Sequence, residues 1–183
     1  MQKKVSKLFS VIAILAMMFA AVPGGTTPVQ ALSSDVVISQ VYGGAGCSTA
    51  GCSTYKNDYI EIFNRGASSV SLSGLSVQYA SAAGSFNAVV ATLSGSLAPG
   101  QYYLVAAAFN TNGVNTLPTP DVTGTTAMGA TAGKIALVTG TTALGCGATS
   151  GTPAPCSPTQ LAQIIDLIEK TAKPGKTKTK GTG

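Results

Sequence analysis

The stretch Lys56–Gly66 reads K-N-D-Y-I-E-I-F-N-R-G and decides the fold class of this chain. Side chains of an extended strand alternate between two faces, so the two isoleucines face one way and Tyr59, Glu61 and Phe63 the other. Asn64 and the glycine that ends the stretch then provide turn chemistry. The stretch therefore predicts one strand that stops at a turn, the anchor strand of a β-sandwich.

Two later segments follow the same plan. L-S-G-L-S-V-Q-Y-A at Leu72–Ala80 is a glycine-marked turn that enters a strand, and L-A-P-G-Q-Y-Y-L-V at Leu97–Val105 is a Pro-Gly turn that enters another. In their order and spacing the three blocks resemble the lamin tail domain family over about Asp35–Ile168. The resemblance implies an all-β, immunoglobulin-like sandwich of a kind that bacteria secrete. The residues that carry the motif are Asp58, Tyr59, Ile60, Glu61, Phe63, Asn64, Gly74, Pro99 and Gly100.

The first residues indicate export. Three lysines precede the apolar run Leu8–Val22, and the small-residue sequence V-Q-A ends at Ala31, a pattern typical of a secretory signal peptide. A membrane-spanning helix needs about 20 apolar residues, so a retained anchor is the less favoured alternative. We expect cleavage between Ala31 and Leu32, secretion, and no membrane span in the mature chain.

Composition and charge predict one extracellular β domain. Only 9% of the residues are charged, and 22 glycines and nine prolines make the chain rich in turns. The net charge of +5 comes from the lysines of residues 1–31 and 169–183, whereas residues 32–168 carry three basic and five acidic side chains. We therefore expect a signal peptide (1–31), a lamin-tail-like sandwich (32–168) and a lysine-rich disordered tail (169–183). The domain itself has no strong nucleic-acid signature.

The four cysteines are spaced as two local pairs. Cys47 and Cys52 bracket a loop of small residues, and Cys146 and Cys156 bracket another. Export favours oxidation, and neither pair has the C-x2-C spacing of a zinc knuckle, so disulfides are favoured over a zinc site. Each ring would remove about 2 to 3 kcal/mol of unfolded-chain entropy.

The chain offers few catalytic residues and predicts no enzyme. It has no histidine, which excludes Ser-His-Asp and Cys-His mechanisms and histidine-rich metal centres. Ser53 and Lys56 stand at S-x-x-K spacing without a companion motif, so we interpret the spacing as coincidence. The sequence G-A-T-A-G-K at Gly129–Lys134 is one residue shorter than a phosphate loop and enters a strand, Lys134–Val138. We expect no cofactor.

Two side-chain groups remain as candidates. Asp58 and Glu61 are close in sequence, but positions three apart on a strand point to opposite faces. We therefore expect Glu61 to pair with Lys56, Arg65 or a main-chain donor rather than to form an acid-base or calcium pair. The tyrosines either fill the core or form an exposed aromatic strip for a glycan or protein. These tyrosines are Tyr55, Tyr59, Tyr79, Tyr102 and Tyr103.

The C-terminal residues depart from the family pattern. Ser157–Gln160 has capping-box character and predicts a helical turn, and Ile164–Ile168 is an apolar strand. The resemblance implies that this strand continues into an aromatic residue and glycines, whereas the chain continues into lysines. The sequence therefore predicts a sandwich that lacks part of its last strand.

Two functions remain open. The favoured one is a secreted, non-catalytic module of lamin-tail type that binds or tethers an unknown extracellular protein or polysaccharide. The alternative is a truncated N-terminal accessory domain of a larger exported nuclease or phosphatase. Translation of the DNA downstream of Lys170 in all three frames would separate them.

Overall fold

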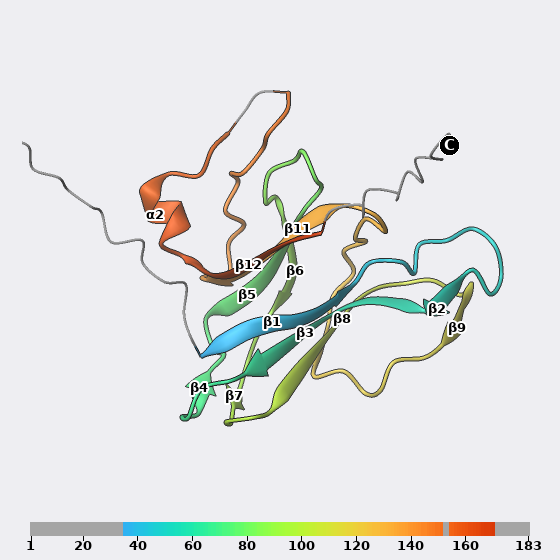
Figure 1. Cartoon of the computed structure of the whole chain (residues 1–183), viewed down its shortest axis with the longest axis horizontal. Helices are drawn as coiled ribbons and strands as arrows, with labels where there is room; N and C mark the ends of the chain where they lie inside the picture. Colours follow the sequence, from blue (N-terminus) through green and yellow to red (C-terminus); the bar gives the residue numbers. More distant parts are fainter. Residues whose placement is uncertain (1–34, 152–153, 171–183) are drawn as a thin grey trace, which may run out of the picture. The chain divides into compact units, whose positions relative to one another are not determined.

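The computed structural model describes residues 35–151 and 154–170. The expected signal peptide, with its cleavage site at Ala31 and Leu32, and residues 171–183 of the expected tail lie outside the described residues. The described part is almost entirely β (Figure 1).

The first sheet is built around the predicted anchor strand. It has the order β1 (Val36–Tyr42), β3 (Asn57–Asn64), β8 (Tyr102–Phe109) and β10 (Val122–Thr123). β3 is antiparallel to both of its neighbours, whereas β10 runs parallel to β8. Burial alternates strictly along β3, as the sequence predicted.

The second sheet has the order β12 (Ile164–Lys170), β11 (Gly133–Thr139), β5 (Leu75–Ala80) and β6 (Ala88–Thr92), and all of its pairs are antiparallel. The strands expected from Leu75 and Lys134 are both present. The last strand was expected to end at Ile168, but β12 continues for two more residues, which pair with the beginning of β11. Glu169 and Lys170 therefore belong to the sheet, because the ladder with β11 holds them.

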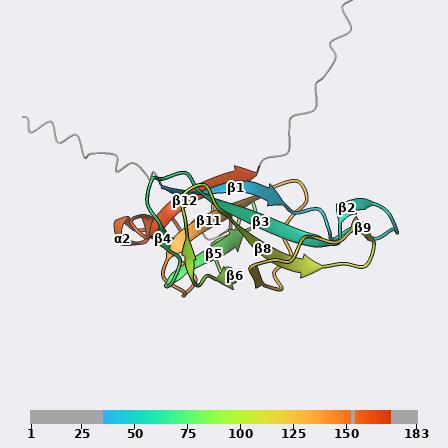
Figure 2. The ribbon, with the colours of Figure 1, turned by 90° about the horizontal axis from the view of Figure 1, so that it is seen from below.

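Two short ribbons accompany the main sheets. β2 (Ser53–Tyr55) runs parallel to β9 (Gly113–Asn115), and β4 (Val70–Ser71) runs antiparallel to β7 (Ser96–Leu97). The β2–β9 ribbon extends beyond the first sheet at one end, as two views at right angles show (Figures 1 and 2).

Three local sequence signals have the backbone geometry that was expected. Gly74 and Gly100 adopt φ of 82° and 74°, the left-handed conformation that glycine accepts at the third position of such turns. The short helix α2 (Pro158–Leu161) begins with a complete capping box between Ser157 and Gln160.

The core lies between the two sheets. Apolar side chains from the inner faces of both sheets pack into one cluster, as expected for a sandwich. The cluster contains Val36, Ile38, Ile60, Ile62, Leu72, Leu75, Val77, Val90, Ala91, Leu93, Leu97, Tyr103, Val105, Ala107, Met128, Ile135 and Leu137.

Neighbouring segments cover parts of the sheet edges. The Ile38 N–H on β1 donates to Asp166 Oδ2 of β12 at 2.7 Å, which joins the edges of the two sheets. At β6, the segment after β10 approaches so closely that a Cβ on Gly124 would lie 1.9 Å from the Val90 oxygen. These contacts reduce the main chain available for pairing with another molecule.

Candidate binding face

Asp58 of β3 is a structural residue of the interior. Its side chain is 1% exposed, on the same face as the isoleucines. Oδ1 accepts the Ala45 N–H at 2.9 Å and Oδ2 accepts the Met128 N–H at 2.8 Å. The carboxylate therefore joins two loops, and both of its oxygens are already bonded.

Asn64 ends the same inner row and is fully buried. Its amide nitrogen donates to the oxygens of Ser68 and Leu97 at 2.9 and 2.8 Å, and its Oδ1 accepts the Gly66 N–H at 2.9 Å. The residue expected to provide turn chemistry therefore does so, and it also fixes the Pro-Gly turn before β8 through Leu97.

Glu61 lies on the opposite face of β3, as expected. It does not share a site with Asp58, because the two carboxylates project from opposite faces. The prediction that Glu61 pairs with Lys56, Arg65 or a main-chain donor was wrong. Its Oε1 instead accepts the Ser39 hydroxyl at 2.6 Å. Ser39 lies at a register shift of β1, which places its short side chain beside Glu61.

Three tyrosines form a compact cluster on this outer face. The Tyr42 and Tyr59 rings stack at 5.5 Å and 14°, and Tyr55 meets both rings edge-on at 5.5 Å. The Tyr42 hydroxyl accepts the Thr54 N–H, and the Tyr59 hydroxyl donates to Gln40. Tyr42 was not among the tyrosines predicted, although the alternation of β1 places it opposite Tyr59.

The environment of Tyr59 disfavours a phenolate. Burial is the main cause that raises its pKa above 10.0, and the neighbouring Tyr55, Glu61 and Tyr42 raise it further. Tyr59 therefore remains a neutral hydrogen-bonding group at physiological pH.

A second aromatic pair lies farther along the same face. Phe63 and Tyr102 have ring centroids 4.6 Å apart, and Tyr102 is 58% exposed. Tyr79 and Tyr103 instead point inward, so the predicted strip contains only part of the expected tyrosines. We call this surface the outer aromatic face. It consists of Tyr42, Tyr55, Tyr59, Glu61, Phe63 and Tyr102.

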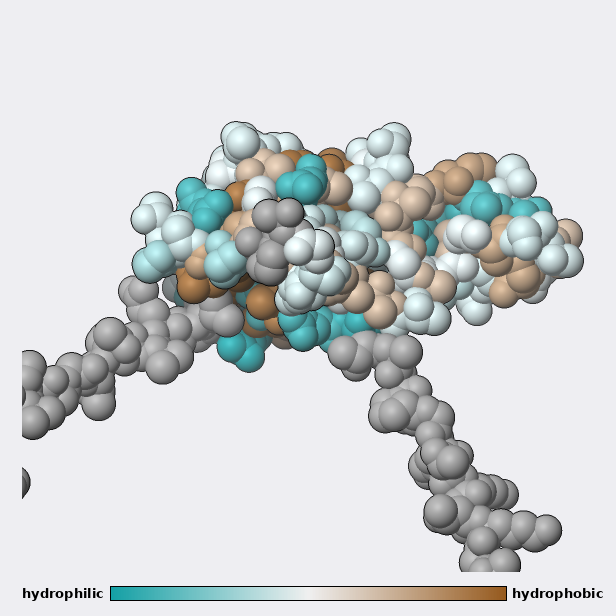
Figure 3. All heavy atoms as spheres, turned by 90° about the horizontal axis from the view of Figure 1, so that it is seen from above, coloured by the Kyte–Doolittle hydropathy of each residue, from teal (hydrophilic) through white to brown (hydrophobic). Residues whose placement is uncertain are grey.

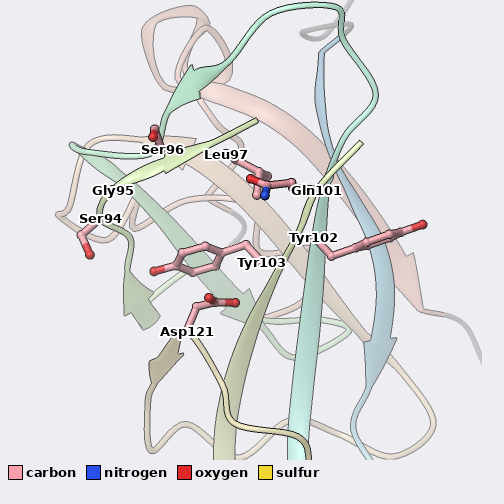
Figure 4. Close-up of a pocket in the computed structure, with 8 residues that line it drawn as sticks. All are labelled: Ser94, Gly95, Ser96, Leu97, Gln101, Tyr102, Tyr103 and Asp121. Carbon is pink, nitrogen blue, oxygen red and sulfur yellow. The ribbon is translucent and has the colours of Figure 1, made fainter. Parts of the chain in front are cut away.

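A hollow of about 510 Å³ opens beside β8 at the Tyr102 end of this face. Figure 4 shows the Tyr103 ring in it, with Asp121 close to the ring and Tyr102 directed away from it. Sequence reasoning missed this hollow because its residues come from three separate segments. It is lined by Ser94, Gly95, Ser96, Leu97, Gln101, Tyr102, Tyr103 and Asp121.

Two motif-like sequences have structural roles. Lys134 is 6% exposed, and its Nζ donates to the oxygens of Gly84 and Gly147 at 2.9 and 2.5 Å. It cannot reach a phosphate, which agrees with our interpretation of the glycine-rich stretch as a turn into β11. Ser53 is buried and donates to the Tyr55 oxygen, so its hydroxyl is not poised against Lys56.

Both predicted disulfides are present, Cys47–Cys52 and Cys146–Cys156. Asn110 and Asn112 donate their side-chain amides to the Cys47 oxygen at 3.3 and 2.9 Å, which attaches the first loop to the β8–β9 connection.

The remaining surface of the described residues carries exposed apolar side chains. Phe109 and Val114 are 62% and 61% exposed near the β2–β9 ribbon. The surface at that end mixes apolar and hydrophilic residues in the view of Figure 3. Among residues 35–151 and 154–170, no cluster of three His, Cys, Asp or Glu side chains could hold a metal. In the same ranges no helix has the length and apolarity to cross a membrane.

Two packed sheets with an aromatic outer face define an all-β, immunoglobulin-like domain. The family model described as Lamin Tail Domain matches residues 30–148, more than half of the chain. The chain therefore belongs to the lamin tail domain family. The match includes β1 to β11 and ends before α2 and β12. No curated protein matches the chain.

Proposed function

We propose that this protein is an exported, non-catalytic module that binds or tethers an extracellular protein or polysaccharide through its outer aromatic face. One contrast carries the proposal. The polar side chains of the inner row, Asp58 and Asn64, form hydrogen bonds to the main chain and are therefore not available to a ligand. The outer face instead combines the exposed Tyr102 ring and several partly exposed rings with hydroxyl and carboxylate groups, the combination that recognition surfaces favour.

The export part of the proposal rests on three features. The charged start, the apolar run and the V-Q-A site are typical of a signal peptide. The two disulfides fit an oxidising compartment. The same binding role would serve a domain that leads a longer exported enzyme, so the two functions considered from the sequence share this face.

The non-catalytic part of the proposal rests on the positions and hydrogen bonds of the two candidate carboxylates, Asp58 and Glu61. The chain has no histidine, both oxygens of Asp58 accept main-chain N–H groups, and Glu61 lies on the opposite face of β3, where it accepts the Ser39 hydroxyl. A general acid-base pair needs two groups that converge on one substrate atom. These two carboxylates do not converge.

Co-sedimentation with insoluble envelope material of the producing organism tests the binding role. Tyr102→Ala removes the most exposed ring of the face and should weaken retention at least fivefold. Leu167→Ser is the matched control, because Leu167 is exposed on the other sheet. Pretreatment of the material with protease or with polysaccharide hydrolases identifies which component is bound. Equal retention of the two variants and the wild type would contradict the assignment of this face.

A further inference from the structure

The hollow beside β8 lies at an interrupted sheet edge. β10 pairs with β8 only at Val105 and Ala106, so the ladder stops before the first residues of β8. At the next edge position, Leu104 donates its N–H to Asp121 Oδ2 at 2.7 Å and accepts the Asp121 N–H at 2.9 Å. Asp121 therefore ends the ladder, and the hollow begins beyond it.

The hollow contains several polar groups that are free to bond to a ligand. Within the described part of the chain, the hydroxyls of Tyr103, Ser94 and Ser96 have no hydrogen-bond partner. Gln101 uses its oxygen to accept the Ala98 N–H and keeps its amide nitrogen available. Asp121 uses Oδ2 and keeps Oδ1. A ligand in the hollow would meet both donors and acceptors within a small space.

Charge and size restrict the class of ligand. The lining has one carboxylate and no basic side chain, so it disfavours phosphates, uronic acids and other anions. Calcium takes six to eight oxygen ligands with several carboxylates, which a single Asp121 does not supply. The volume of about 510 Å³ lies within the range of about 300 to 1,000 Å³ that is usual for small-molecule sites.

An extended peptide fits this edge poorly. Strand addition needs a row of unpaired main-chain groups, and Asp121 already occupies both groups of Leu104. The free edge is therefore too short for a strand. The apolar lining residues, Leu97 and Tyr103, are only 3% and 7% exposed, so the hollow offers little apolar surface to a hydrophobic side chain.

We propose that this hollow is a subsite for one neutral sugar residue of a polysaccharide. This inference rests on the proposed function and specifies its ligand class. A sugar ring carries several hydroxyls that each donate and accept, which matches the mixture of serine, tyrosine, amide and carboxylate groups around the hollow. The adjoining outer aromatic face, which begins at Tyr102, would hold the neighbouring sugar units.

The test uses the exported protein, labelled with ¹⁵N, and three neutral probes: cellohexaose, chitohexaose and mannohexaose. Polygalacturonate is the anionic comparison. At least one neutral hexamer should bind and shift the amide signals of Gln101, Tyr103 and Leu104. Tyr103→Phe removes one hydroxyl only, and Asp121→Asn keeps an oxygen for the Leu104 N–H while it replaces the free acceptor by a donor. Each variant should weaken binding at least tenfold.

The control variant is Phe109→Ala, which removes an exposed ring at the other end of β8. A strand rises about 3.3 Å per residue, so Phe109 lies about 23 Å from Tyr102. It should change affinity less than twofold. Thermal unfolding of every variant checks that it is folded. If one of the two conservative changes, at Tyr103 or at Asp121, unfolds the protein, the other still tests the subsite.

The subsite would be overturned if no neutral hexamer binds, if polygalacturonate binds more tightly, or if both conservative variants bind as well as wild type. A hexamer whose binding is weakened by Tyr102→Ala alone would remove the subsite and leave the proposed function intact. Hexamer binding with the expected variant effects, but no retention of the wild-type protein on envelope material, would support the subsite and contradict the proposed function. A peptide that shifts the same amides would identify strand addition and also overturn the sugar assignment.

Discussion

Replacement of Asp58 by asparagine should destabilise the domain because two buried N–H groups depend on its carboxylate. Asparagine keeps one acceptor oxygen and presents an NH₂ group to the other N–H, so either Ala45 or Met128 loses its partner. A buried donor without a partner costs about 1 to 3 kcal/mol, and hydrogen bonds to charged groups contribute about 1.5 to 3. We expect a loss of about 2 to 4 kcal/mol out of a total stability of about 5 to 15.

Urea unfolding monitored by circular dichroism measures this loss. Glu61→Gln is the matched control, because it makes the same carboxylate-to-amide change on the same strand, at an outer position that keeps an acceptor for Ser39. It should change the free energy of unfolding by about 0.5 kcal/mol or less. Amide exchange should accelerate at Ala45 and Met128 in the Asp58 variant. If Asp58→Asn is no more destabilising than Glu61→Gln, the bridging role is wrong.

Four further outcomes are expected. Asn64→Ala removes three main-chain bonds and should cost about 2 to 4 kcal/mol in urea unfolding; a change below 0.5 would contradict its role. Because folding raises the pKa of Tyr59 above 10.0, the stability that neutral Tyr59 contributes should be fully present below pH 10 and be lost as the pH rises from 10 through the raised pKa; Tyr59→Phe should reduce that loss, and an unchanged pH profile would argue against it. Peptide mapping without reduction should recover Cys146 linked to Cys156, and their reduction should cost about 2 to 3 kcal/mol. N-terminal sequencing of secreted protein should begin at Leu32, and a chain that keeps its first residue would refute processing.

The parts of the fold that depend on local pattern could be predicted from the sequence. β3 followed from alternation, and the turns at Gly74 and Gly100 followed from glycine and proline chemistry. The partner of Glu61 was missed because a register shift in β1 brings Ser39 to it, and such a shift leaves no mark in the sequence of β3.

The interior roles of polar residues were harder to predict. Asp58 shares its parity with the buried isoleucines, which is a usable signal of burial. Its partners, however, lie 13 and 70 residues away. Lys134 likewise bonds to carbonyls 50 and 13 residues distant. Long-range pairing of this kind depends on loop placement, which a single sequence does not encode in any short motif.

The two polar residues of the inner row also have a consequence for how the sheet assembles. A slip of β3 by one residue is excluded because it would turn the isoleucines outward. A slip by two residues keeps every side chain on its own face, so hydrophobic alternation alone does not oppose it. It would, however, carry the Asp58 carboxylate out of reach of its N–H donors and leave an unpaired charge in the interior. Asp58 and Asn64 therefore specify the pairing register of β3, one near each end of the strand. Variants that lack them should form shifted strand pairings during refolding.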